Sequence, residues 1–213
     1  MSFRVCFVGD SYVNGTGDPE CLGWRGRVCR AAWQAGHMVT HYDLGVRGDT
    51  TALIAARWRA ECEARLPADS DRRLVFSFGL NDTAEVAGAG LRVPPERSAA
   101  NARAILAEAS AWLPTLWLGP PPANEPMSPM TPTPGLTVSF AQPRIDALNA
   151  AYAAIAAELG VPYLDLSTPL RREPRYVASQ SAGDGLHPSA DGYRMLAELV
   201  LGWPAWRAWM NAI

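Results

Sequence analysis

The stretch Phe3-Arg4-Val5-Cys6-Phe7-Val8-Gly9-Asp10-Ser11 decides the fold class that we predict for this chain. Residues 3–8 are short, apolar and rich in β-forming side chains, and Gly9 ends the run abruptly. This pattern predicts a buried β-strand followed at once by a polar turn.

Strand and helix patterns alternate along the rest of the sequence. Further strands are predicted over residues 37–44, 74–78, 115–118 and 161–164, and helices over 22–35, 50–65, 95–112, 140–159 and 189–201. Asp49 or Thr50 is the expected N-cap of the second helix, and Ser189 that of the last. The alternation predicts an α/β fold with three α/β/α layers and a five-stranded parallel sheet. Polar residues within 37–44 place that strand at a sheet edge.

Length, charge and composition limit the kinds of protein that this chain can be. The 213 residues suit one domain over residues 1–213. The formal net charge is −2, so no nucleic-acid partner is expected. All 19 basic residues are arginine. The lack of lysine excludes a Schiff-base lysine and a Walker-type phosphate loop.

No export signal and no membrane-spanning apolar run are visible, so we expect a cytoplasmic protein. The four cysteines lack C-x-x-C spacing, and we interpret them as small buried thiols. His37 and His41 have a helical metal spacing but fall in a predicted strand, so no metal is expected. Gly15-Thr16-Gly17 fails the dinucleotide pattern, and no cofactor is expected.

Two segments stand outside the alternation. Residues 119–135 are rich in proline and are predicted to form a long irregular loop near the active site. Residues 203–213 form a tryptophan-rich tail, in which Trp203, Trp206 and Trp209 have helical spacing. We favour packing of this tail onto the domain, and a dimer face or an acyl-facing surface is the alternative. Nothing else in the sequence supports a homodimer.

Polar residues follow three of the predicted strands, where a parallel sheet gathers its functional groups. Ser11, Gly48 and Asn81 each lie just after a strand, and Asp184-Gly185-Leu186-His187 precedes the last helix. A serine needs a base beside it and a third group that orients the base. Each residue also has a structural explanation: a turn serine, a turn glycine, a helix-capping asparagine, a loop-capping aspartate and a surface histidine.

Four short blocks, around Ser11, Gly48, Asn81 and His187, thus follow one another along the chain. With these blocks in this order, the sequence resembles the GDSL, or SGNH, hydrolase family. Gly23-Trp24 also looks like the family's usual sequence, whereas Tyr12 stands where leucine or isoleucine is common. The resemblance implies the flavodoxin-like strand order 2-1-3-4-5. It also implies that Ser11 is the nucleophile, His187 the base and Asp184 the residue that orients His187.

The resemblance further implies an oxyanion hole made by Ser11, Gly48 and Asn81. A backbone N–H beside a glycine can approach an oxygen closely, and an asparagine amide donates without titrating. We interpret Asp10 and Asp82 as residues that pin these loops, not as catalytic acids. The expected substrate pocket includes Tyr12, Leu80 and Leu186.

The predicted function is therefore a serine esterase that hydrolyses small carboxylic esters. Its expected substrates are short-chain acyl esters, acetylated sugars, lysophospholipids or thioesters. An acyltransferase that uses the same acyl-enzyme is the alternative, and a non-catalytic binding module with the same fold is a second one. Because all the expected catalytic residues are present, the sequence favours catalysis over binding alone.

Overall fold

The main sheet has five parallel strands in a computed structural model that describes residues 2–211. Its order is β2-β1-β3-β6-β9, which becomes 2-1-3-4-5 when these strands alone are numbered. The predicted fold class and strand order are confirmed, and β2 lies at the edge as expected. The strands are β1 (Ser2–Gly9), β2 (Met38–Gly45), β3 (Asp71–Ser77), β6 (Thr115–Leu118) and β9 (Tyr163–Leu164).

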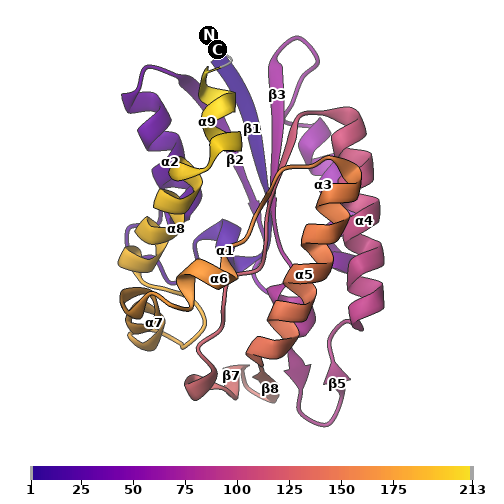
Figure 1. Ribbon diagram of the computed structural model, residues 1–213, viewed down its shortest axis with the longest axis vertical. Helices are drawn as coiled ribbons and strands as arrows, with labels where there is room; N and C mark the ends of the chain where they lie inside the picture. Colours follow the sequence, from indigo (N-terminus) through magenta and orange to yellow (C-terminus); the bar gives the residue numbers. More distant parts are fainter. Residues whose placement is uncertain (1, 212–213) are drawn as a thin grey trace.

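Helices cover both faces of this sheet, which gives the three predicted layers (Figure 1). One face carries α2 (Gly23–Gln34), α8 (Ala190–Gly202) and α9 (Pro204–Asn211). The other face carries α3 (Thr51–Glu63), α4 (Pro95–Trp112) and α5 (Gln142–Leu159). The long helices begin and end close to the residues predicted from their periodicity.

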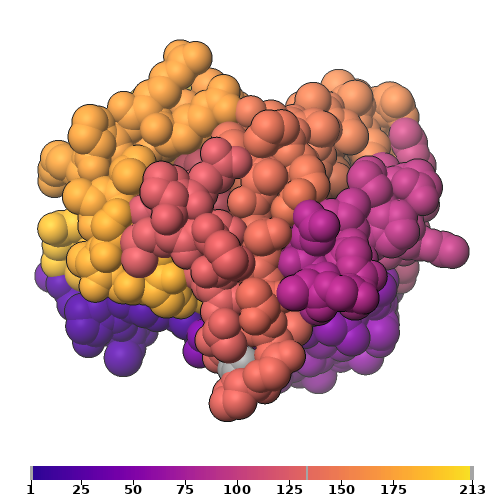
Figure 2. Space-filling model, turned by 90° about the horizontal axis from the view of Figure 1, so that it is seen from below, coloured from indigo at the N-terminus to yellow at the C-terminus, as the bar shows by residue number. Residues whose placement is uncertain are grey.

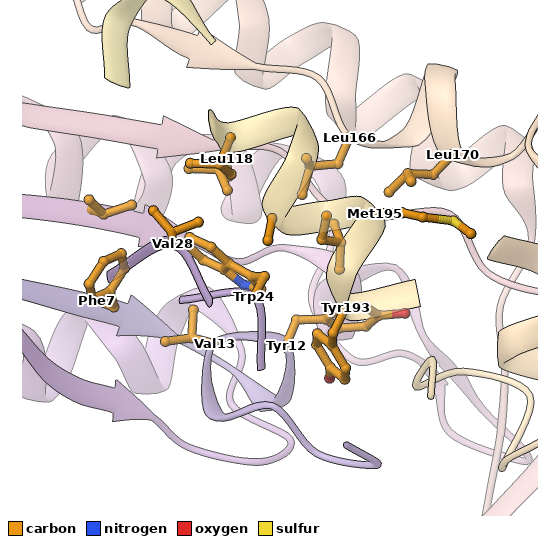
Figure 3. Close-up of a cluster of buried hydrophobic side chains, with 14 of the residues drawn as sticks. Phe7, Tyr12, Val13, Trp24, Val28, Leu118, Leu166, Leu170, Tyr193 and Met195 are labelled. Carbon is orange, nitrogen blue, oxygen red and sulfur yellow. The ribbon is translucent and has the colours of Figure 1, made fainter. Parts of the chain in front are cut away.

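The central strand β1 explains why the sheet is buried on both sides. Phe3, Val5 and Phe7 join the core beneath α2 and α8, whereas Cys6 and Val8 join the core beneath α3 and α4. A strand covered on both faces is largely apolar, as residues 5–8 are. Phe7 meets Trp24 of α2 edge-on, with ring centroids 5.4 Å apart (Figure 3).

Gly9 ends β1 at a point where two strands lie unusually close. A Cβ atom at this position would lie 1.9 Å from the backbone oxygen of Ser77, at the end of β3. Only a residue without a side chain fits there. This close approach brings the loops that follow β1 and β3 together at the carboxyl ends of the strands.

A second sheet, which we did not predict, lies at this end of the main sheet. It has the order β5-β4-β8-β7, with β4 (Glu85–Val86), β5 (Gly90–Leu91), β7 (Met130–Thr133) and β8 (Leu136–Ser139). Residues 119–135 are thus not irregular throughout, because they contain β7 and the 3₁₀ helix η2 (Glu125–Met127). These strands are too short for an alternating pattern, and pairs such as Glu85 with Ser139 join distant segments.

Four short helical elements also escaped prediction. They are α1 (Ser11–Asn14), η1 (Leu80–Thr83), α6 (Ser167–Leu170) and α7 (Pro174–Ser181). Helices of one or two turns show too little of the 3.6-residue period to be recognised. Two of them, α1 and η1, directly follow β1 and β3.

The tryptophan-rich tail packs onto the domain over its described part. Trp206 is 1% exposed, and Trp203 and Trp209 contact the same core. Arg73 of β3 donates a hydrogen bond to the backbone oxygen of Trp209 at 2.8 Å. Residues 212–213 of the tail lie outside the described residues.

Within residues 2–211, no helix is both long enough and apolar enough to span a bilayer. The same residues contain no group of three or more His, Cys, Asp and Glu side chains arranged to hold a metal ion. The four cysteines are free, and Cys21 is exposed, unlike Cys6, Cys29 and Cys62. The interpretation of all four as buried thiols was therefore wrong at Cys21.

Candidate active site

Ser11 lies at the junction between β1 and α1, and its side chain is buried. Asp10 is the N-cap of α1, and its Oδ1 atom accepts a hydrogen bond from the backbone N–H of Tyr12 at 3.0 Å. This cap fixes the turn that carries Ser11. The serine hydroxyl thereby lies at the carboxyl ends of the strands, where the loops meet.

His187 and Asp184 come from the loop between α7 and α8, near the other end of the chain. The Nδ1 atom of His187 lies 2.7 Å from Asp184 Oδ2, and the Nε2 atom lies 2.8 Å from Ser11 Oγ. A proton on Nδ1 satisfies the carboxylate and leaves the Nε2 lone pair directed at the serine hydroxyl. The imidazole can therefore accept the serine proton.

Asp184 is held as a carboxylate by its own loop. Its Oδ1 atom accepts hydrogen bonds from the backbone N–H groups of Leu186 at 2.9 Å and His187 at 2.7 Å. Partial burial raises the pKa of Asp184, but these bonds and the His187 side chain outweigh it and bring the pKa well below its usual range. Asp184 is thus ionised at neutral pH.

Gly48 and Asn81 line the same cavity as Ser11. Gly48 has a φ of +84°, a conformation that favours glycine. Asn81 lies in η1, and its Nδ2 donates to Asp49 O at 3.0 Å and, more weakly, to Asp10 Oδ2 at 3.3 Å. Ser11, Gly48 and Asn81, each of which carries an N–H donor, thus line one cavity.

Asp10 and Asp82 lie beneath this space and tie its loops together. Asp82 accepts hydrogen bonds from the backbone N–H of Thr51 at 3.0 Å and from the Thr51 hydroxyl. It therefore caps α3 from another loop, where Thr50 is the N-cap without a side-chain bond of its own. Burial raises the pKa of Asp82, and it raises that of Asp10 to about 7. Repulsion from Asp82 and Asp49 adds to the rise at Asp10, while the Tyr12 N–H opposes it.

A cavity of about 510 Å³ opens in front of Ser11. Figure 2 views the molecule from this end, where the segment around residues 120–140 lies across the middle of the face. One wall of the cavity is apolar and comes mainly from the second sheet and the residue after it: Met130, Pro132, Leu136, Val138 and Phe140. The alternation Leu136-Thr137-Val138-Ser139-Phe140 was a strand signal that we missed, because we placed a helix from residue 140.

Of the three expected pocket residues, only Leu186 lines this cavity. Tyr12 and Leu80 are each 2% exposed and pack in the core beneath α2 and α8. The expectation that they line the pocket was wrong, because both side chains turn inward from their short helices. Tyr12 instead donates from its hydroxyl to Leu186 O, next to His187. Buried Gln180 donates to the same oxygen at 2.9 Å.

Two arginines that we did not single out from the sequence, Arg47 and Arg92, line the cavity beside Gly48 and Asn81. The Arg92 guanidinium donates to Gly48 O at 2.8 Å and to Asn81 Oδ1 at 3.3 Å. Arg47 directly precedes Gly48 in the sequence, and this neighbour relation could have indicated it. In a chain whose basic residues are all arginine, no sequence signal distinguishes Arg92 from the rest.

Comparisons with known proteins give one family and many similar folds. No curated protein matches the chain in sequence. A lipase/acylhydrolase from Enterococcus faecalis superposes with a TM-score of 0.74, at 22% identity over 96% of each chain. A psychrotrophic esterase from Pseudoalteromonas, inhibited by monoethylphosphonate, gives 0.69 at 13% identity over 98% of each chain.

A mutant of an acetyl-xylooligosaccharide esterase from Geobacillus gives a TM-score of 0.68 at 19% identity, over 94% of this chain and 93% of that one. At such identities these likenesses concern the fold. The family model described as the GDSL-like lipase/acylhydrolase family matches residues 7–195. This chain therefore belongs to the GDSL-like lipase/acylhydrolase family, a family of ester-bond hydrolases.

Proposed function

We propose that this protein is a serine esterase that cleaves carboxylic esters through an acyl-enzyme on Ser11. The observation that carries the proposal is the distance of 2.8 Å between His187 Nε2 and Ser11 Oγ, with Asp184 Oδ2 2.7 Å from His187 Nδ1. This arrangement is a nucleophile, a base and a group that orients the base. It supports catalysis over a binding role, for which no such alignment is needed.

In the first half of the reaction, Ser11 Oγ attacks the ester carbonyl while His187 Nε2 takes the hydroxyl proton. The carbonyl oxygen becomes an oxyanion, which the N–H groups of Ser11, Gly48 and Asn81 stabilise. The Asn81 hydrogen that makes the long contact with Asp10 is the one available for this bond. The C–O bond then breaks, and His187 gives its proton to the departing alcohol.

In the second half, a water molecule replaces the alcohol. His187 takes a proton from the water as its oxygen attacks the acyl carbon, and the same oxyanion hole is used again. The bond to Ser11 breaks, Ser11 recovers its proton from His187, and the carboxylic acid leaves. Throughout, the Asp184 carboxylate stabilises the imidazolium that forms twice.

The cavity supports esters with a modest apolar part. Met130, Leu136, Val138 and Phe140 provide an apolar wall on one side of Ser11, and about 510 Å³ suits a small substrate. Short-chain acyl esters, acetylated sugars, lysophospholipids and thioesters are the substrate classes that we propose. The esterase activities named for the similar structures are consistent with this range.

The test is hydrolysis of aryl esters of graded acyl length by the wild type and by Ser11→Ala. Ser110→Ala, at an exposed position on α4, is the matched control. We expect turnover by the wild type and the control, and loss of roughly 10³-fold or more in kcat for Ser11→Ala. Equal rates in all three proteins would end the proposal. Adding acceptor alcohols and identifying the products separates hydrolysis from acyl transfer.

A further inference from the structure

Arg92 connects the second sheet with the candidate oxyanion hole. It follows β5, and its backbone N–H donates to Ala84 O at 2.9 Å. Its neighbours Leu91 and Val93 line a separate apolar cavity of about 320 Å³, beside α4 and α5. Arg92 itself lines the cavity in front of Ser11. Leu91 and Val93 thus face one cavity, whereas Arg92 faces the cavity that Ser11 lines.

The guanidinium of Arg92 bridges two loops that carry oxyanion donors. It donates to Gly48 O in the loop after β2 and to Asn81 Oδ1 in η1. The planar fork of a guanidinium suits two acceptors at once, whereas an ammonium is a single point charge. The bridge therefore links the positions of Gly48 and Asn81.

The same bridge sets the orientation of the Asn81 amide. Arg92 occupies its oxygen end, while Asp49 O and Asp10 Oδ2 accept from its nitrogen end. If the amide turned over, its NH₂ group would face the guanidinium, and two donors would be left opposed. The nitrogen is therefore held on the side where a donor is needed.

Charge is the second contribution of Arg92. Three acidic side chains lie near the hole, and the structure pairs Asp49 with Arg57 at 2.7 Å but gives Asp10 and Asp82 no such ion pair within residues 2–211. A negative charge that develops on the substrate is repelled by those of these groups that are ionised and is attracted by Arg92. The attraction is strongest in a cavity from which water is excluded.

We propose that Arg92 is a positioning residue of the oxyanion hole. This inference rests on the proposed function of the site. Arg92 acts mainly through Gly48 and Asn81, which it holds in position before the oxyanion forms, and its charge adds to their effect. Because the oxyanion exists only in the transition state, loss of Arg92 should lower kcat and leave KM nearly unchanged.

The test compares Arg92→Gln and Arg92→Lys with the matched control Arg144→Gln. Arg144 anchors the same part of the molecule from the other side, donating to Thr83 O and to Ser139 O at 3.0 Å each. It lines the separate apolar cavity and not the cavity of Ser11. Arg144→Gln therefore removes hydrogen bonds that anchor this region without removing a side chain that lines the cavity of Ser11.

We expect Arg92→Gln to lower kcat by roughly 10- to 100-fold, with KM changed less than about twofold. Arg92→Lys should recover part of this loss, because it restores the charge and one of the two bonds. Arg144→Gln should lower the melting temperature without lowering kcat. If Arg92→Gln does not fold, a lower kcat at unchanged KM in Arg92→Lys supports the proposal, and wild-type kcat in that variant overturns it.

The affinity for a boronic acid with a short alkyl chain is a second measurement, which does not depend on the stability of the loops. The boron atom bonds to the hydroxyl oxygen of the active serine. One of the boronate's own oxygens in this tetrahedral adduct then occupies the oxyanion hole. The boronic acid's affinity for Arg92→Gln should fall in parallel with kcat/KM, while its affinity for Arg144→Gln stays at the wild-type level. Wild-type kcat and boronate affinity in Arg92→Gln would overturn the inference, as would a change confined to KM. Failure of the proposed function would differ, because the wild type itself would then hydrolyse no ester.

Discussion

His187 Nε2 lies 2.8 Å from Ser11 Oγ, although the two residues are 176 positions apart in the chain. The strand β1 and its close contact with β3 hold the serine, while the loop between α7 and α8 holds the histidine. Tyr12 and Gln180 connect the two parts, since both donate to Leu186 O beside His187. The alignment of the two reacting groups thus depends on packing across the whole domain.

Asp184→Asn should lower kcat by roughly 10³- to 10⁴-fold with a small change in KM. The carboxylate accepts from His187 Nδ1, whereas an amide can turn its NH₂ group toward Nδ1 and favour the wrong tautomer. Steady-state kinetics with an aryl acetate measures the effect. Asp191→Asn, at an exposed position on the next helix, serves as the control and should keep wild-type kcat. A wild-type rate in Asp184→Asn would show that Asp184 does not orient the imidazole.

Asp10→Asn should change how the free energy of unfolding depends on pH. Burial raises the pKa of Asp10 from 3.8 to about 7. The stability that protonated Asp10 contributes is therefore fully present below about pH 4 and is lost as the pH rises through about 7. At about 1.4 kcal/mol per pKa unit, this loss amounts to a few kcal/mol.

The measurement is urea unfolding between pH 4 and pH 8. Wild type should lose stability relative to Asp10→Asn as the pH rises, because the neutral amide does not ionise. The same substitution at exposed Asp69 gives the control for a change of surface charge. Parallel curves for wild type and Asp10→Asn would contradict the raised pKa.

Gly9→Ala should destabilise the fold by about 3 kcal/mol or more. The added Cβ would lie 1.9 Å from the backbone oxygen of Ser77, which cannot move away without separating β1 from β3. Gly202→Ala is the matched control, because nothing lies within 4 Å of its added Cβ, and we expect a change within about 0.5 kcal/mol. Chemical denaturation of both variants measures the difference, and equal midpoints would refute this account of Gly9.

Leu136→Trp should shift the preference of the enzyme toward shorter acyl chains. Leu136 belongs to the apolar wall of the cavity, and a larger side chain leaves less room there. The ratio of kcat/KM for acetyl and hexanoyl esters measures the preference. Leu53→Trp, at an exposed position on α3, should leave this ratio unchanged. The same ratio in Leu136→Trp and wild type would place the acyl group elsewhere.

The main sheet could be predicted because its central strands β1, β3 and β6 are largely buried and its long helices show their period. Ser11, Gly48 and Asn81 could also be placed together, because each follows a strand and parallel strands end on one side of the sheet. The roles of Asp184 and His187 came instead from the resemblance to the family. The second sheet could not, since its strands are short and pair across long sequence separations, such as Glu85 with Ser139. Arg92 and the inward turn of Tyr12 depend on the same tertiary contacts, which no local pattern reveals.

Intact-mass analysis after treatment with a fluorophosphonate tests the central claim most directly. Wild type should gain one phosphonyl group, which peptide mapping places on Ser11, because His187 activates that hydroxyl. Ser11→Ala should gain none, and His187→Ala should react far more slowly. A wild-type protein that stays unmodified, or that is labelled at another residue, would contradict the account.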